Sequence, residues 1–93
     1  MINEIVFGLT AIEWRKQNSD KPTNRNQRDY ASVLDLTILN NLEFLDAMLI
    51  QWDVLNMDER RKFLKEAYDF QHPILARSQT VKKLQKLADK FMK

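Results

Sequence analysis

The residues able to perform acid–base or metal chemistry are few in this chain. It has one histidine, His72, and no cysteine, whereas zinc sites and activated nucleophiles usually draw on several such side chains. Glu43, Asp46 and Asp53 fall within about 80° of one another on one predicted helix, a grouping that a hydrolase or a metal site can use. No second acidic helix supports them, so we expect a solvated acidic edge. We predict no catalytic residue, metal or cofactor, and a protein that is not an enzyme.

Two short clusters combine arginine with aromatic side chains, the residue types that dominate interface hot spots. They comprise Trp14, Arg15, Arg28, Asp29 and Tyr30. One interpretation is a small recognition surface. The other is structural, with Trp14 packing on Leu9 around a helix cap. In that case Asp29 caps the following helix, and Arg15 or Arg28 joins the loop to a helix.

The last predicted helix carries a row of lysines on one side, formed by Lys82, Lys83, Lys86 and Lys90. Four ammonium groups in a row can follow a phosphate backbone, which makes this side a candidate nucleic-acid contact. The alternatives are a membrane-surface helix and a solvated face whose lysines suit the helix dipole. The net charge of the whole chain is only +2, which by itself implies no nucleic-acid partner.

A long helix, from about 29 to 53, is the predicted centre of the fold. Between Val33 and Trp52, 13 of 20 residues are apolar, and they lie on several sides of the helix. Such a helix belongs inside a bundle or at an oligomer interface. Asn40 and Asn41 provide either a buried amide that fixes register or oligomeric state, or one solvated side chain and one that bonds to the loop. The candidate protein contacts outside the main stripe are Leu36, Leu39, Phe44, Met48 and Ile50.

Shorter helices are predicted around this centre. Capping-box patterns at Thr10 and at Asn56 start two of them, and the first of these ends near residue 17. The second is expected to kink at Pro73, because proline cannot donate to the preceding turn. A final two-faced helix spans 80–92. One face of the helix after Asn56 is apolar and contains Phe63, Leu64, Ala67, Tyr68, Phe70, Ile74 and Leu75.

These elements predict an all-α protein with one domain over residues 1–93, built as an antiparallel bundle of three or four helices. One glycine and two prolines provide few turns for an all-β fold. No stretch approaches the roughly 18 apolar residues of a membrane span. The first residues lack the basic start and long apolar core of a signal peptide, so we expect a cytoplasmic protein.

Three spaced stretches resemble the C-terminal region of bacterial and phage KilA-N domain-containing proteins. They are INEIVFGLTAIEWRKQNSD, NQRDYA and NLEFLDAMLIQ, and the resemblance covers about residues 2–75. Where relatives have a Gly-Asn pair before Arg-Asp-Tyr-Ala, this chain has Arg25, Asn26 and Gln27. The DNA-binding KilA-N domain forms the other half of that family's proteins, so the resemblance transfers no DNA-contacting residue to this chain.

The leading functional expectation is a non-enzymatic interaction or oligomerisation module whose partner is a protein, either a second copy or another subunit. The alternative is a small nucleic-acid-binding protein that uses the basic last helix. The multi-sided apolar central helix favours the first interpretation, because a chain of 93 residues has few other elements with which to cover it.

Overall fold

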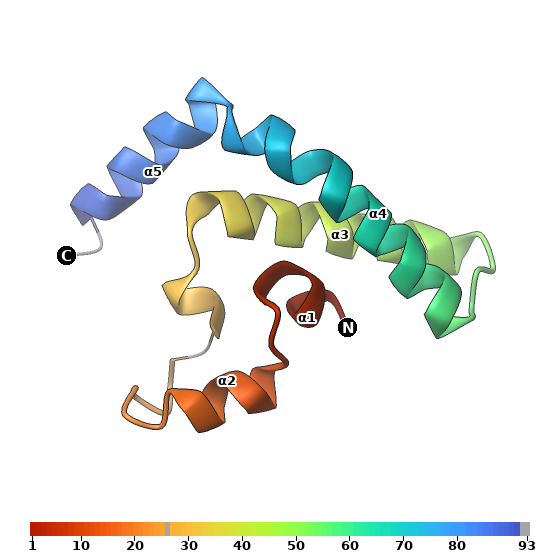
Figure 1. The fold of residues 1–93 in the computed structure, drawn as a ribbon, viewed down its shortest axis with the longest axis horizontal. Helices are drawn as coiled ribbons and strands as arrows, with labels where there is room; N and C mark the ends of the chain where they lie inside the picture. Colours follow the sequence, from red (N-terminus) through yellow and green to blue (C-terminus); the bar gives the residue numbers. More distant parts are fainter. Residues whose placement is uncertain (26, 92–93) are drawn as a thin grey trace.

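The computed structural model describes residues 1–25 and 27–91, and this part of the chain contains helices and loops but no strand. The predicted all-α class is confirmed (Figure 1). The elements are α1 (Ile2–Phe7), α2 (Ala11–Gln17), the 3-10 helix η1 (Gln27–Tyr30), α3 (Val33–Gln51), α4 (Met57–Ala76) and α5 (Gln79–Phe91).

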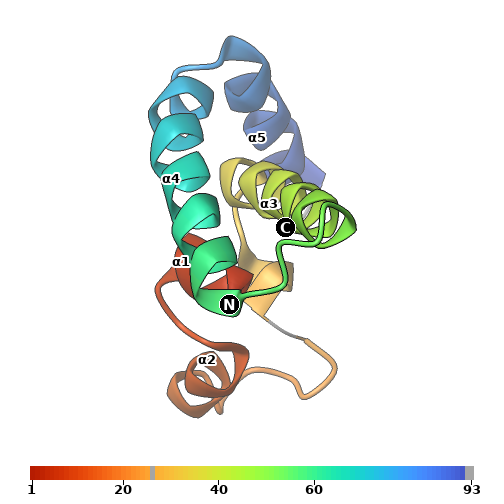
Figure 2. The ribbon, with the colours of Figure 1, turned by 90° about the vertical axis from the view of Figure 1, so that its right-hand side faces the viewer.

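Helix α3 is the central element, as predicted, and packs against α1, α4 and α5. It forms an antiparallel hairpin with α4 (Figure 1). Helix α1 lies across this hairpin on the side of α2, and α5 folds back toward the start of α3 (Figure 2). The buried core lies where α1, α3 and α4 meet and consists of Val6, Ile38, Leu39, Leu42, Leu49 and Leu64.

The central helix begins four residues later than the predicted start near residue 29. Its N-cap is Ser32, whose hydroxyl accepts the Asp35 N–H at 3.1 Å. The predicted cap, Asp29, lies instead within the 3-10 helix η1. Both aspartate and serine cap helices well. Residues 27–30 form the tighter 3-10 helix, so the α-helix begins only after Ser32. The interpretation of Asp29 as the cap of this helix is therefore wrong.

The end of α3 is a Schellman motif. The Val54 N–H donates to the Leu49 carbonyl at 2.9 Å, and the Asp53 N–H donates to the Ile50 carbonyl at 3.0 Å. These are the two bonds that define the motif. Asp53 has a positive φ of 64°, a backbone conformation that usually selects glycine. Val54 packs against the core cluster that contains Leu49, so the turn also fixes how α4 returns along α3.

The other predicted helix boundaries are close to the observed ones. The Thr10 hydroxyl accepts the Glu13 N–H and the Glu13 carboxylate accepts the Thr10 N–H, so the predicted capping box is confirmed. The Asn56 side chain accepts the Glu59 N–H at 3.0 Å and starts α4. Helix α4 continues past Pro73 to Ala76. Residue 92, the predicted end of the last helix, lies outside the described residues. None of the described helices is both long and apolar enough to cross a bilayer.

The core is small compared with the apolar surface outside it. Six described apolar residues are buried, whereas thirteen large ones are exposed. Single exposed apolar residues are normal in proteins, and only a contiguous group indicates a binding surface. The arrangement of these thirteen residues on the helices therefore decides whether the fold has such a surface.

Candidate protein-interaction surface

Helix α4 presents an exposed row of apolar side chains. Phe63, Ala67, Phe70 and Ile74 are separated by four, three and four positions, so they share one side of the helix. Phe70 is 72% exposed, Phe63 and Ile74 are also exposed, and Ala67 is half-buried. The core contact of α4 centres on a different row, in which Leu64 is fully buried and Leu75 packs against the core. Ala67 also packs against the core, at the edge of the exposed row.

Helix α3 presents a second exposed row beside the first. Phe44 is 67% exposed, and Met48, one turn later, is half-buried. Asn41 lies one turn before Phe44, and its Nδ2 donates to Oε1 of Gln71 on α4 at 2.9 Å. Gln71 lies between Phe70 and Ile74 along α4, so this bond places the two rows next to each other.

We call these two rows the apolar face, which consists of Phe44, Met48, Phe63, Ala67, Phe70 and Ile74. Its residues come from both helices of the α3–α4 hairpin. Helix α5 contacts the beginning of α3, where Gln85 Oε1 accepts the Val33 N–H at 2.7 Å. The aromatic rings of the apolar face are left exposed to solvent, which is the arrangement expected of a docking surface.

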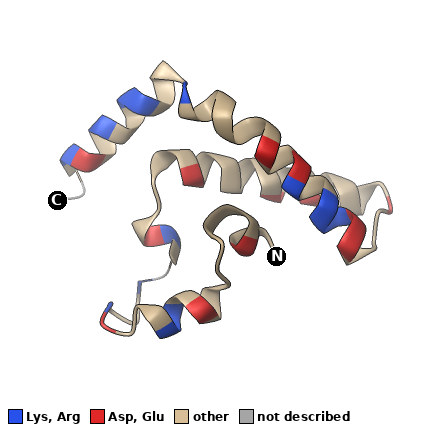
Figure 3. Cartoon of the chain, in the orientation of Figure 1, with Lys and Arg blue, Asp and Glu red and all other residues tan. Residues whose placement is uncertain are grey.

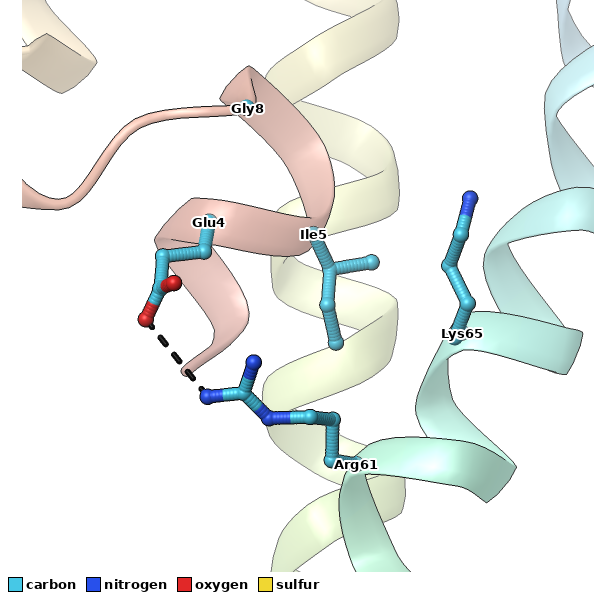
Figure 4. A pocket seen from close by; sticks show the side chains of 5 residues that line it. All are labelled: Glu4, Ile5, Gly8, Arg61 and Lys65. Atoms are coloured by element: carbon cyan, nitrogen blue, oxygen red, sulfur yellow. Dashed lines mark ion pairs between the residues drawn. The ribbon is translucent and has the colours of Figure 1, made fainter. Parts of the chain in front are cut away.

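The opposite side of the hairpin is covered by α1. Glu4 on α1 pairs with Arg61 on α4 at 3.6 Å, and Ile5 lies beside them in a groove of about 460 Å³ (Figure 4). Lys65, which also lines this groove, pairs with Asp69 at 2.9 Å. Both cations therefore have a carboxylate partner, and we interpret the groove as the seam between α1 and α4.

The five predicted contact residues of the central helix differ in their burial and in the side of the helix on which they lie. Leu39 is only 1% exposed and belongs to the core, so its assignment to an interaction surface is wrong. Leu36 is half-buried and packs against the core. Ile50 is exposed but lies about 160° around the helix from Met48, away from the apolar face. Phe44 and Met48 remain on that face. The physical reason is that α1 covers the side of α3 that carries Leu39.

The exposed α4 row was not recognised in the sequence as a surface. Its residues share an apolar side of the helix with Leu64, Tyr68 and Leu75, and the whole side was expected to face the core. The structure buries one half of this side and exposes the other. The signal in the sequence is its width, because one buried stripe needs fewer apolar positions than α4 provides.

Asn41 is exposed and bonds across the hairpin to Gln71 at 2.9 Å. The interpretation of Asn41 as a buried amide is therefore wrong, and so is the one in which it bonds to the loop. Among the described residues the buried amide is Gln27, which was not predicted from the sequence. Its Nε2 donates to the Leu9 carbonyl and its Oε1 accepts from Asn3, both at 3.4 Å.

The arginine–aromatic clusters make contacts within the chain. The Arg15 guanidinium donates to the carbonyls of Lys21 and Arg25 and lies over the Trp14 ring at 4.9 Å. The Trp14 ring stacks on Tyr30 with centroids 5.7 Å apart. These contacts hold the 18–25 loop against α2 and η1. Arg15 thus joins the loop to a helix, which is one part of the structural interpretation.

Arg28 joins this region to the hairpin. Its Nη2 lies 2.5 Å from Oε1 of Glu43 on α3 and 3.4 Å from Oδ1 of Asn3 on α1. Asp46, another of the three grouped carboxylates, pairs with Arg60 at 2.9 Å. The described residues contain no group of His, Cys, Asp and Glu side chains able to hold a metal ion.

The four lysines of α5 are exposed, and they are Lys82, Lys83, Lys86 and Lys90. Figure 3 shows the basic positions along this helix in blue. The apolar side of α5 is only partly covered, because Leu84, Leu87 and Phe91 are exposed as well.

No protein-family model, curated protein or solved structure matches the chain.

Proposed function

We propose that this chain is a non-enzymatic protein-interaction module that associates through the apolar face. The observation that carries the proposal is the pair of adjacent exposed rows on α3 and α4, with Phe44 and Phe70 at 67% and 72% exposure. Burial of apolar surface is favourable by roughly 25 cal/mol per Å², so a partner that covers these rings gains affinity.

The resemblance to the C-terminal region of KilA-N proteins gives the proposal a biological setting. In a protein that also carried a DNA-binding half, pairing through this module would hold two such halves together. The second DNA contact would then become intramolecular and benefit from a raised effective concentration. This setting is an inference from resemblance, whereas the apolar face belongs to the chain itself.

The test compares Phe70→Glu with Ile12→Glu. These two positions are equally exposed, at 72% and 71%, but Ile12 lies on α2, away from the apolar face. A buried charge opposite an apolar partner should weaken association by at least about 2 kcal/mol, or roughly 30-fold in Kd. Light scattering behind size exclusion measures the association, and circular dichroism verifies that both variants remain helical. Equal association of the two variants would contradict a role for the apolar face.

A second candidate function is nucleic-acid binding through the lysines of α5. The observation in its favour is that all four lysines are exposed and lie on one side of that helix. Changing all four to glutamate should abolish binding, and wild-type affinity should fall steeply as salt increases. Fluorescence anisotropy with a labelled duplex tests this, and undiminished binding by the four-glutamate variant would exclude the lysines.

A further inference from the structure

The spacing of the exposed α4 row is the same in both directions along the helix. Phe63, Ala67, Phe70 and Ile74 are four, three and four positions apart. An identical helix laid antiparallel on this row therefore brings Phe63 opposite Ile74 of the other copy, and Ala67 opposite Phe70. The smallest residue of the row then faces a large ring, which is the alternation that lets two helices interdigitate.

Charges at the two ends of the row favour the same orientation. Glu59 lies one turn before Phe63, and Arg77 lies one turn after Ile74; both are exposed. They are about 27 Å apart along α4 at 1.5 Å per residue, too far to pair within one chain. In an antiparallel pair, each Glu59 approaches Arg77 of the other copy. A parallel pair would place like charges together, which disfavours that orientation.

The row on α3 obeys the same symmetry. A two-fold axis that pairs α4 with α4 also stacks α3 on α3, because the two helices form one hairpin. The Asn41–Gln71 bond sets these two residues level with each other, so the middle of the α4 row lies level with Phe44. This ring then meets Phe44 of the other copy. A two-fold interface requires a surface that is complementary to itself in this way.

We propose that a second copy of this chain occupies the apolar face, with the two α4 helices antiparallel and each Glu59 beside Arg77 of the other copy. The two hairpins together make a four-helix arrangement that buries Phe44, Phe63, Phe70 and Ile74. This inference rests on the proposed function, since it specifies the partner and the geometry of the same surface.

Disulfide trapping tests the orientation directly, because the native chain has no cysteine. Glu59→Cys and Arg77→Cys variants are prepared separately, mixed and exposed to mild oxidant. The antiparallel pair should give a cross-linked dimer in the mixture and little cross-linking in either variant alone. A mixture of Ile12→Cys with Arg77→Cys measures collisional cross-linking, since Ile12 is also exposed but lies on α2.

The outcomes separate the geometry from the proposed function. Efficient cross-linking of Glu59→Cys with itself would show a parallel pair and overturn the inference. A wild-type dimer whose mixture cross-links no better than the Ile12→Cys control would show another interface and also overturn it. In both cases self-association would still stand. A wild-type protein that remains monomeric would overturn the inference together with self-association.

Exchange of the two charges provides an independent test. Glu59→Arg or Arg77→Glu alone places like charges together at both ends of the pair, and should weaken the dimer by up to about tenfold in Kd. A mixture of the two variants restores opposite charges in the heterodimer and should recover wild-type affinity. Sedimentation equilibrium measures this recovery, and a mixture that associates no better than its components would contradict the antiparallel pair.

Discussion

Asp53 holds the backbone conformation that ends α3. Its φ of 64° lies in the left-handed region, and the two Schellman bonds around it direct the chain into α4. An aspartate tolerates this conformation but is less favourable there than glycine, which has no Cβ. The sequence contains no glycine near this turn, so the usual marker is missing, although the predicted end near residue 53 is close to the observed one.

We predict that Asp53→Gly stabilises the protein by about 1 kcal/mol, because it removes the left-handed strain. Urea denaturation measures the change in the free energy of unfolding. Gln51→Gly is the control, since it adds the same flexibility inside the right-handed helix and should destabilise by about 1 kcal/mol. A loss of stability in Asp53→Gly would show that its side chain contributes more than the backbone strain costs.

Arg60 ties the end of α3 to the start of α4. Its Nε donates to Asp46 at 2.9 Å and its Nη1 donates to the Leu55 carbonyl at 2.8 Å. The side chains of Arg60 and Asp46 are only 12% and 17% exposed. The sequence predicts Asp46 on a solvated acidic edge, because the distant arginine that packs on it cannot be identified from local spacing.

Arg60→Lys should lower the free energy of unfolding by about 1–2 kcal/mol, since a single ammonium group cannot reproduce both bonds of the guanidinium. The neighbouring Arg61→Lys is the matched control. Arg61 is exposed and its partner Glu4 is 3.6 Å away, so its replacement should change stability by less than about 0.5 kcal/mol. Equal effects in chemical denaturation would contradict the assignment of Arg60 as the structural arginine.

At the scale of the elements, α4 has two apolar rows with different roles. Leu64 lies in the core, whereas Phe70 lies on the apolar face. The capping residues predicted where this helix begins, because caps act locally. Periodicity could not separate the two rows, because both are apolar and the position of α3 and α1 against α4 depends on contacts between distant parts of the chain.

Concentration-dependent unfolding distinguishes these rows. Association with the folded state raises the denaturation midpoint as protein concentration rises. Leu64→Ala should lower the midpoint at every concentration, by about 2–5 kcal/mol in the free energy of unfolding, and keep the concentration dependence. Phe70→Ala should instead make the midpoint depend less on protein concentration, with little change in the free energy of unfolding of the monomer. If Phe70→Ala behaved like Leu64→Ala, the ring would have to be part of the core.

At the scale of the whole molecule, the decisive feature is an imbalance among the described residues, between a six-residue core and thirteen exposed large apolar residues. The sequence was sufficient to predict the all-α class and the central position of α3, since both follow from composition and helical periodicity. It was not sufficient to predict which side of α3 stays open, as the placement of Leu39 shows. That side depends on how the six-residue helix α1 docks across the hairpin.

The most direct test of self-association is the solution mass of the wild-type chain, measured by light scattering behind size exclusion at several concentrations and two salt levels. Pairing through the apolar face predicts a mass approaching twice 11.1 kDa at micromolar concentration, and this mass should be unaffected by salt because the contact is mainly apolar. A mass of 11.1 kDa at every concentration would contradict pairing of this chain with itself.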